Sequence, residues 1–104
     1  MTRITIFIPI TQHSKGHIDY FLRKLADNFG GFTISRYRLR ESLFLGGWVN
    51  KKQLVKDSIA MLMVDTSKAK RKVKAYLRVL KLEMEQKFKE ELVWITTQNI
   101  EQIL

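Results

Sequence analysis

The order in which strand-like and helix-like segments alternate constrains the fold of this chain more than any other feature. The first segment, residues 2–10, places apolar and polar side chains alternately, which predicts a strand with one apolar face. The residues on that face are Ile4, Ile6, Ile8 and Ile10. Pro9 cannot donate a hydrogen bond to a neighbouring strand, so we expect the strand to end close to it.

A first amphipathic helix is expected over residues 15–29, because apolar residues recur there at helical spacing. Ser14 is the expected N-cap, and Gly30 or Gly31 is expected to end the helix in the left-handed conformation. The residues predicted to face the core are Ile18, Phe21, Leu22, Leu25 and Phe29.

A second, longer helix is expected over about residues 68–90, with Thr66 or Ser67 as its N-cap. Its predicted apolar stripe is Val73, Tyr76, Leu77, Leu80, Met84 and Phe88. Its first fourteen residues, KAKRKVKAYLRVLK, hold seven basic residues and no acidic one. A helix N-terminus is the positive end of the helix dipole, so each cation there costs a few tenths of a kcal/mol, up to about 1 kcal/mol.

The remaining segments are predicted to be extended. FTISRYRLR continues into a hairpin excursion over residues 37–56, which contains the turn signals Gly46-Gly47 and Asn50-Lys51. The apolar run SIAMLMV, residues 58–64, fits a central strand that is buried on both faces, or on one face and at an interface. Residues 92–97 form the last expected strand, and residues 98–104 form a tail.

This order predicts one α+β domain over residues 1–104, a ferredoxin-like β-α-β-β-α-β sandwich with an extra β-hairpin excursion. In that plan the first strand and SIAMLMV lie at the centre of the sheet. Pairing through sheet edges or helices would make a homodimer.

The balance of charge predicts a polyanionic partner. The chain carries 19 basic and 10 acidic residues, a net charge of +9, which favours a nucleic acid or an acidic protein. It has no cysteine, which suits the cytoplasm, and its N-terminus lacks the features of a signal peptide. No apolar stretch is long enough to span a membrane, and no motif predicts a cofactor or a metal.

The basic helix start is the first candidate site. Orphan N–H groups and cations there point the same way, and a bound phosphate would offset the unfavourable charge–dipole arrangement. The alternative is a solvated face whose penalty is screened by salt. The candidate residues are Lys68, Lys70, Arg71, Lys72, Lys74 and Arg78.

The segment SRYRLR is the second candidate site. In a strand Arg36, Arg38 and Arg40 share one face, where three guanidinium groups repel each other unless an anion lies across them. Tyr37 and Trp48 offer rings for stacking on unpaired bases, although core packing is the commoner role for a tryptophan. The alternative is a charged strand that discourages edge-to-edge aggregation.

The two histidines, His13 and His17, are a weaker candidate. Two imidazoles and a lysine are able in principle to cleave RNA by acid–base chemistry, which makes a small ribonuclease one alternative function. A structural or solvated role is the commoner outcome, because no further catalytic motif accompanies them.

The phrases F-G-G-x-T and G-x-W carry a resemblance. The matching residues are Phe29, Gly30, Gly31 and Thr33, then Gly46, Gly47 and Trp48, and then Asp57 before the apolar run. In these phrases the chain resembles a loose group of small uncharacterised bacterial and phage-type proteins. The resemblance implies the order of elements given above and no activity. The longer, more basic SRYRLRESLFL departs from the pattern.

Together these features predict a small nucleic-acid-binding module without catalytic residues, with RNA favoured over DNA because no helix-turn-helix is present. The alternative is a protein-interaction module, an adaptor or inhibitor that binds an acidic partner through the same face.

Overall fold

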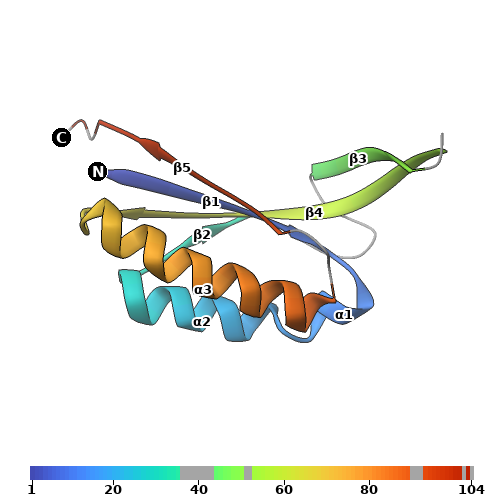
Figure 1. The fold of residues 1–104 in the computed structure, drawn as a ribbon, viewed down its shortest axis with the longest axis horizontal. Helices are drawn as coiled ribbons and strands as arrows, with labels where there is room; N and C mark the ends of the chain where they lie inside the picture. Colours follow the sequence, from blue (N-terminus) through green and yellow to red (C-terminus); the bar gives the residue numbers. More distant parts are fainter. Residues whose placement is uncertain (36–43, 51–52, 90–92, 102, 104) are drawn as a thin grey trace.

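The chain folds into an antiparallel sheet with helices on one of its faces, so the predicted α+β class is confirmed (Figure 1). The computed structural model describes residues 1–35, 44–50, 53–89, 93–101 and 103, and for 44–50 and 53–58 it describes the backbone alone. The elements are β1 (Thr2–Pro9), α1 (Gln12–Lys15), α2 (Ile18–Phe29), β2 (Thr33–Ile34), β3 (Phe44–Asn50), β4 (Gln53–Thr66), α3 (Lys70–Phe88) and β5 (Trp94–Asn99).

The strands lie in the order β2-β4-β1-β5, and β3 pairs with the first half of β4. All pairs are antiparallel. β4 and β1 are therefore the central strands, in agreement with their apolar sequences. α2 connects β1 to β2 and α3 connects β4 to β5, and both helices pack on the same face of the sheet (Figure 1).

The core lies between this face of the sheet and the two helices. The predicted apolar faces are confirmed: the four isoleucines of β1 and the segment after it are at most 6% exposed, and the stripe of α3 is buried except for the half-buried Tyr76. In α2, Leu22 and Phe29 are half-buried and pack against the core. The sheet contributes Ala60, Leu62 and Val64 from β4.

The predicted first helix begins later than its sequence suggests. Ser14 does not cap it but lies in the short helix α1, where its hydroxyl accepts from the Thr11 N–H at 2.8 Å and the Thr11 hydroxyl accepts from the Ser14 N–H at 3.1 Å. This capping box uses the hydroxyl that the prediction assigned to the longer helix. α2 then begins at Ile18 and ends as predicted, with Gly30 in the left-handed conformation at φ 90°.

The second predicted helix also begins later, at Lys70, with Ala69 as its N-cap. The predicted caps Thr66 and Ser67 are wrong. Thr66 is the last residue of β4 and pairs with Thr2, so its hydroxyl lies in the turn, where it accepts from the Lys68 N–H at 3.1 Å.

Two of the predicted strands are longer than their apolar runs. SIAMLMV lies in the 14-residue β4, and only one face of its described part is covered by helices. β5 runs to Asn99, so the predicted tail begins inside a strand: Gln98 and Asn99 still pair with Arg3 and Thr2. In the described part of the chain, no helix combines the length and apolar character needed to cross a membrane.

Candidate nucleic-acid interface

The start of α3 has no side-chain cap from any described residue. The first backbone bond of the helix runs from the Val73 N–H to the Ala69 carbonyl at 3.1 Å. The N–H groups of the three preceding residues therefore have no partner within the helix. The first turn also contains no acidic side chain. The helix itself therefore supplies no negative charge to these N–H groups and to the positive end of its dipole.

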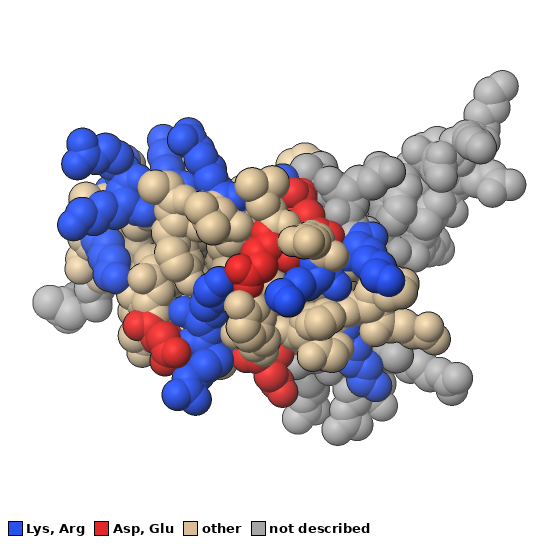
Figure 2. All heavy atoms as spheres, turned by 60° about the horizontal axis from the view of Figure 1, so that its bottom comes forward, with Lys and Arg blue, Asp and Glu red and all other residues tan. Residues whose placement is uncertain are grey.

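Five exposed cations surround this helix start. Among the residues that the structure describes, none of the five forms an ion pair. Figure 2 shows basic side chains gathered at the end of the molecule where α3 begins, whereas basic and acidic side chains alternate over the rest of that face. We call this set the α3 basic cluster, and it consists of Lys70, Arg71, Lys72, Lys74 and Arg78.

Most of the α3 basic cluster lies on one side of the helix. Tyr76 marks the side that faces α2, because its ring contacts Phe29 with centroids 5.3 Å apart. Lys70, Lys74 and Arg78 recur at four-residue spacing, which places them in one row on the flank turned away from α2. Like charges at this spacing repel, so the row is not explained by the stability of the helix.

Lys68 has a different role from the other predicted cations. Its ammonium group donates to the backbone carbonyl of Asn28 and lies 5.5 Å from the centroid of the Phe29 ring. Lys68 therefore joins the end of α2 to the turn before α3. Lys68 is therefore not a free cation, although the sequence predicted that all six basic residues hold phosphate.

The two acidic residues of α3, Glu83 and Glu85, have partners, in contrast to the α3 basic cluster. Glu83 accepts from Lys24 of α2 at 2.8 Å, and this hydrogen bond holds the pKa of Glu83 below its ordinary value of 4.5. Glu85 accepts from Lys81 at 2.7 Å and from the Val93 N–H at 2.9 Å, and its pKa is lowered by both bonds, the Lys81 bond more strongly. These carboxylates hold α3 to α2 and to the residue before β5.

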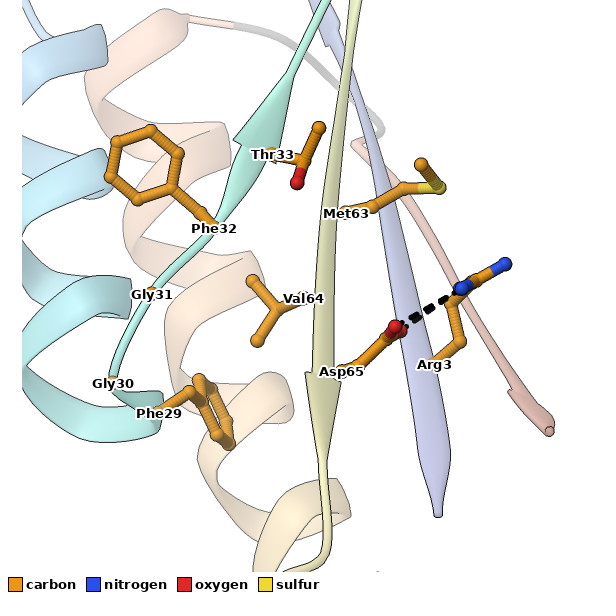
Figure 3. Close-up of a pocket in the computed structure, with 9 residues that line it drawn as sticks. All are labelled: Arg3, Phe29, Gly30, Gly31, Phe32, Thr33, Met63, Val64 and Asp65. Atoms are coloured by element: carbon orange, nitrogen blue, oxygen red, sulfur yellow. Dashed lines mark hydrogen bonds and ion pairs between the residues drawn. The ribbon is translucent and has the colours of Figure 1, made fainter. Parts of the chain in front are cut away.

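A hollow of about 370 Å³ lies at the sheet edge where α2 ends and β2 begins. Figure 3 shows its wall of Gly30, Gly31 and Phe32 opposite the end of β4. The two ionisable groups in its lining pair with each other: the Arg3 guanidinium donates to both Asp65 oxygens, at 2.9 and 3.0 Å. This pairing lowers the pKa of the Asp65 carboxyl. The hollow therefore offers no free acid or base.

The other face of the sheet carries residues that the sequence analysis did not select. Trp94 of β5 pairs with Phe7 of β1, which pairs with Met61 of β4, so the three side chains form one row on the face opposite the helices. Trp94 is 63% exposed, and the other two are half-buried. The sequence signal was the alternation Val93-Trp94-Ile95, in which the tryptophan lies opposite two core-facing residues.

The second candidate site cannot be compared with the structure. Arg36, Tyr37, Arg38 and Arg40 lie outside the described residues, and so does the side chain of Trp48. Their predicted roles stay predictions.

The histidines lie away from the α3 basic cluster, at the other end of the helix layer. His13 belongs to α1, and His17 precedes α2 without a side-chain hydrogen bond to that helix. Figure 1 places α1 beside the end of α3 rather than beside its start. Within the described residues no three His, Asp or Glu side chains are grouped closely enough to hold a metal ion.

The sequence matches no protein-family model and no curated protein. The resemblance to small bacterial and phage-type proteins therefore stays a prediction.

Proposed function

We propose that this protein is a small nucleic-acid-binding module that holds phosphate groups with the α3 basic cluster. The strand order β2-β4-β1-β5 and the two helices on one face also support the ferredoxin-like plan, in which each helix connects two parallel strands with a third strand between them. The fold names no activity by itself, so the function is argued from the charges at the start of α3.

The observation that carries the proposal is the combination of unpaired cations and an uncapped helix N-terminus. A stable helix ordinarily places a Ser, Thr, Asp or Asn at its N-cap and acidic residues in its first turn. α3 has Ala69 at the N-cap and three basic residues in its first three positions. Phosphate oxygens would accept from the free N–H groups and neutralise the cations, which removes both unfavourable features at once.

Nucleic acid is favoured over an acidic protein because the free cations are spread over more than two turns of helix. Arg78 follows Lys70 by eight residues, so the row is about 12 Å long at 1.5 Å per residue. A polyphosphate chain presents charges repeatedly over such a length, whereas a folded acidic partner would also need a complementary shape.

The test is fluorescence anisotropy with labelled single-stranded RNA, duplex RNA and duplex DNA over a series of salt concentrations. We expect the logarithm of the affinity to fall linearly with the logarithm of the salt concentration, by about 0.7 per phosphate contact for a single strand and about 0.9 for a duplex. Poly-glutamate is the matched competitor, because it carries repeated negative charges without phosphates.

Two results would count against the proposal. An absence of binding to all three nucleic acids at low salt would exclude it. Displacement of the RNA by an equal charge concentration of poly-glutamate would favour the acidic-protein alternative instead.

A further inference from the structure

The face of the sheet opposite the helices is apolar where a one-sided antiparallel sheet is ordinarily polar. Phe7, Met61 and Met63 are half-buried on this face, and Trp94 is 63% exposed. Figure 3 shows Met63 on this side of β4 and Val64 on the helix side. Exposed apolar surface of this kind marks an interaction site more often than chance.

Where β1 pairs with both β4 and β5, the strand register arranges the face in three rows. Trp94, Phe7 and Met61 form the first row, and the Cβ atoms of residues paired in this way lie about 5 Å apart, so the two aromatic residues are neighbours on this face. The second row is Thr96, Thr5 and Met63, and the third is Gln98, Arg3 and Asp65. The hydroxyl groups of Thr5 and Thr96 therefore lie in the row next to the rings, and the Gln98 amide lies one row further along the sheet.

The charges indicate which partner fits this face. Arg3 and Asp65 are the only charged side chains in its three rows, and they neutralise each other, so no free carboxylate there repels an anion. A second copy of the chain would bring two net charges of +9 together, which opposes association through this face. A polyanion with flat apolar groups is not repelled by a carboxylate on this face, and it is attracted by the positive net charge of the chain.

The row of the α3 basic cluster lies on the side of the helix layer above the same sheet edge as Trp94. α3 passes over β1 as it connects β4 to the edge strand β5, while α2 lies on the side of β2. The row of Lys70, Lys74 and Arg78 is turned away from α2 and therefore toward the edge formed by β5. Trp94 belongs to that edge strand, but it lies beside the far half of α3, because the N–H of Val93 before it donates to Glu85. Arg78 is therefore the cation of the row nearest to the ring, about 10 Å from Glu85 along the helix, and Lys70 is about 22 Å from Glu85, so one ligand strand has to cross this distance.

We infer that this face binds the unpaired bases of a single-stranded nucleic acid, with bases stacked on Trp94 and Phe7 and phosphates held around the β5 edge by the α3 basic cluster. This inference rests on the proposed function and adds to it the class of nucleic acid. Aromatic side chains accept bases of any sequence because every base has a flat π face. A duplex keeps those faces stacked on each other and cannot offer them.

The experiment compares Trp94→Ala, Trp94→Phe and Leu82→Ala with the unchanged protein. Leu82 is a matched control, because it is 69% exposed on the outer side of α3. Binding of single-stranded RNA, single-stranded DNA and duplex DNA is measured by anisotropy at one salt concentration, and circular dichroism verifies that each variant is folded. Tryptophan fluorescence is recorded during each titration.

We expect Trp94→Ala to weaken single-strand binding at least about fivefold and to change duplex binding less than about twofold. Trp94→Phe should retain most of the single-strand affinity, because it keeps a ring, and should lose the part of the fluorescence quenching that comes from Trp94 rather than from Trp48. Leu82→Ala should change neither affinity.

The inference is overturned if Trp94→Ala binds single strands as tightly as the unchanged protein, or loses single-strand and duplex affinity equally. It is also overturned if sedimentation shows a dimer that Trp94→Ala converts to monomers, since a second copy would then occupy the face. In all three cases salt-dependent binding by the unchanged protein would leave the proposed function intact, whereas an absence of any binding would remove the proposed function itself.

Discussion

The two ends of α3 use their charges in different ways. At its end, Glu83 and Glu85 bind Lys24, Lys81 and the Val93 N–H, so these carboxylates hold the helix to its neighbours. At its start, where Lys70 is about 20 Å from Glu83 along the helix, the α3 basic cluster has no acidic partner among the described residues. Both sets of charges oppose the helix dipole. The acidic set is explained by contacts within the fold, and the basic set is left for a ligand.

The largest expected effect comes from removing the basic row. The triple variant Lys70→Ala, Lys74→Ala and Arg78→Ala should weaken single-strand binding about 100-fold at 0.1 M salt, since each of three lost phosphate contacts contributes about fivefold. Its free energy of unfolding should stay the same or rise slightly, because repulsion along the helix is relieved. Anisotropy and urea denaturation measure the two quantities.

The matched control removes three other exposed cations: Lys15→Ala, Arg23→Ala and Lys87→Ala. It lowers the net charge by the same three units, from +9 to +6. Equal losses of affinity in the two triple variants would mean that total charge, and not the start of α3, determines binding.

The next effect concerns the other end of the helix. Glu85→Ala should lower the free energy of unfolding by about 1–3 kcal/mol, because the partly buried Val93 N–H loses a charged acceptor. Glu85→Gln keeps an acceptor oxygen and should lose less. RNA affinity should change less than about twofold in both variants, and a larger loss would show that the two ends are not separate in function.

A substitution at the N-cap brings the two roles into conflict. Ala69→Asp should raise the free energy of unfolding by about 1 kcal/mol, because it caps α3 and places a negative charge at the positive end of the dipole. It should also weaken RNA binding by repelling phosphate. Ala69→Asn is the control that caps without a charge, and equal affinities of the Asp and Asn variants would contradict an anion site here.

The smallest effect is a dependence of stability on pH. Hydrogen bonds lower the pKa of Glu83 and Glu85 below 4.5 in the folded protein, so their contribution is complete above that pH and is lost as the pH falls through the lowered values. Urea denaturation between about pH 6 and about pH 3 should show this loss. The double variant Glu83→Gln and Glu85→Gln should flatten the profile, leaving the part due to Asp65, whose pKa is also lowered.

The local sequence patterns correctly predicted which face of β1 and of α3 is buried. The isoleucines of β1 and the stripe of α3 are buried as predicted, because periods of 2 and 3.6 residues determine which side chains share a face. The α+β class followed from the order of those patterns.

The contacts that depend on residues far apart in the sequence could not be predicted. Thr66 and Ser67 both have suitable hydroxyls, but the pairing of Thr66 with Thr2 keeps its hydroxyl in the turn. Lys68 and Lys70 are alike in sequence, and only the position of the Asn28 carbonyl separates them. The row of Trp94, Phe7 and Met61 depends on strand register, because residues 54 to 87 positions apart meet there.

The most direct test of the difference between the two ends of α3 is an NMR titration of the ¹⁵N-labelled protein with a short single-stranded RNA. We predict that the amide signals of residues 69–74 shift first and furthest, while those of residues 83–88 stay in place. Shifts centred on residues 83–88, or no shifts at the start of α3 while the RNA is bound, would contradict the assignment of the basic cluster to a phosphate ligand.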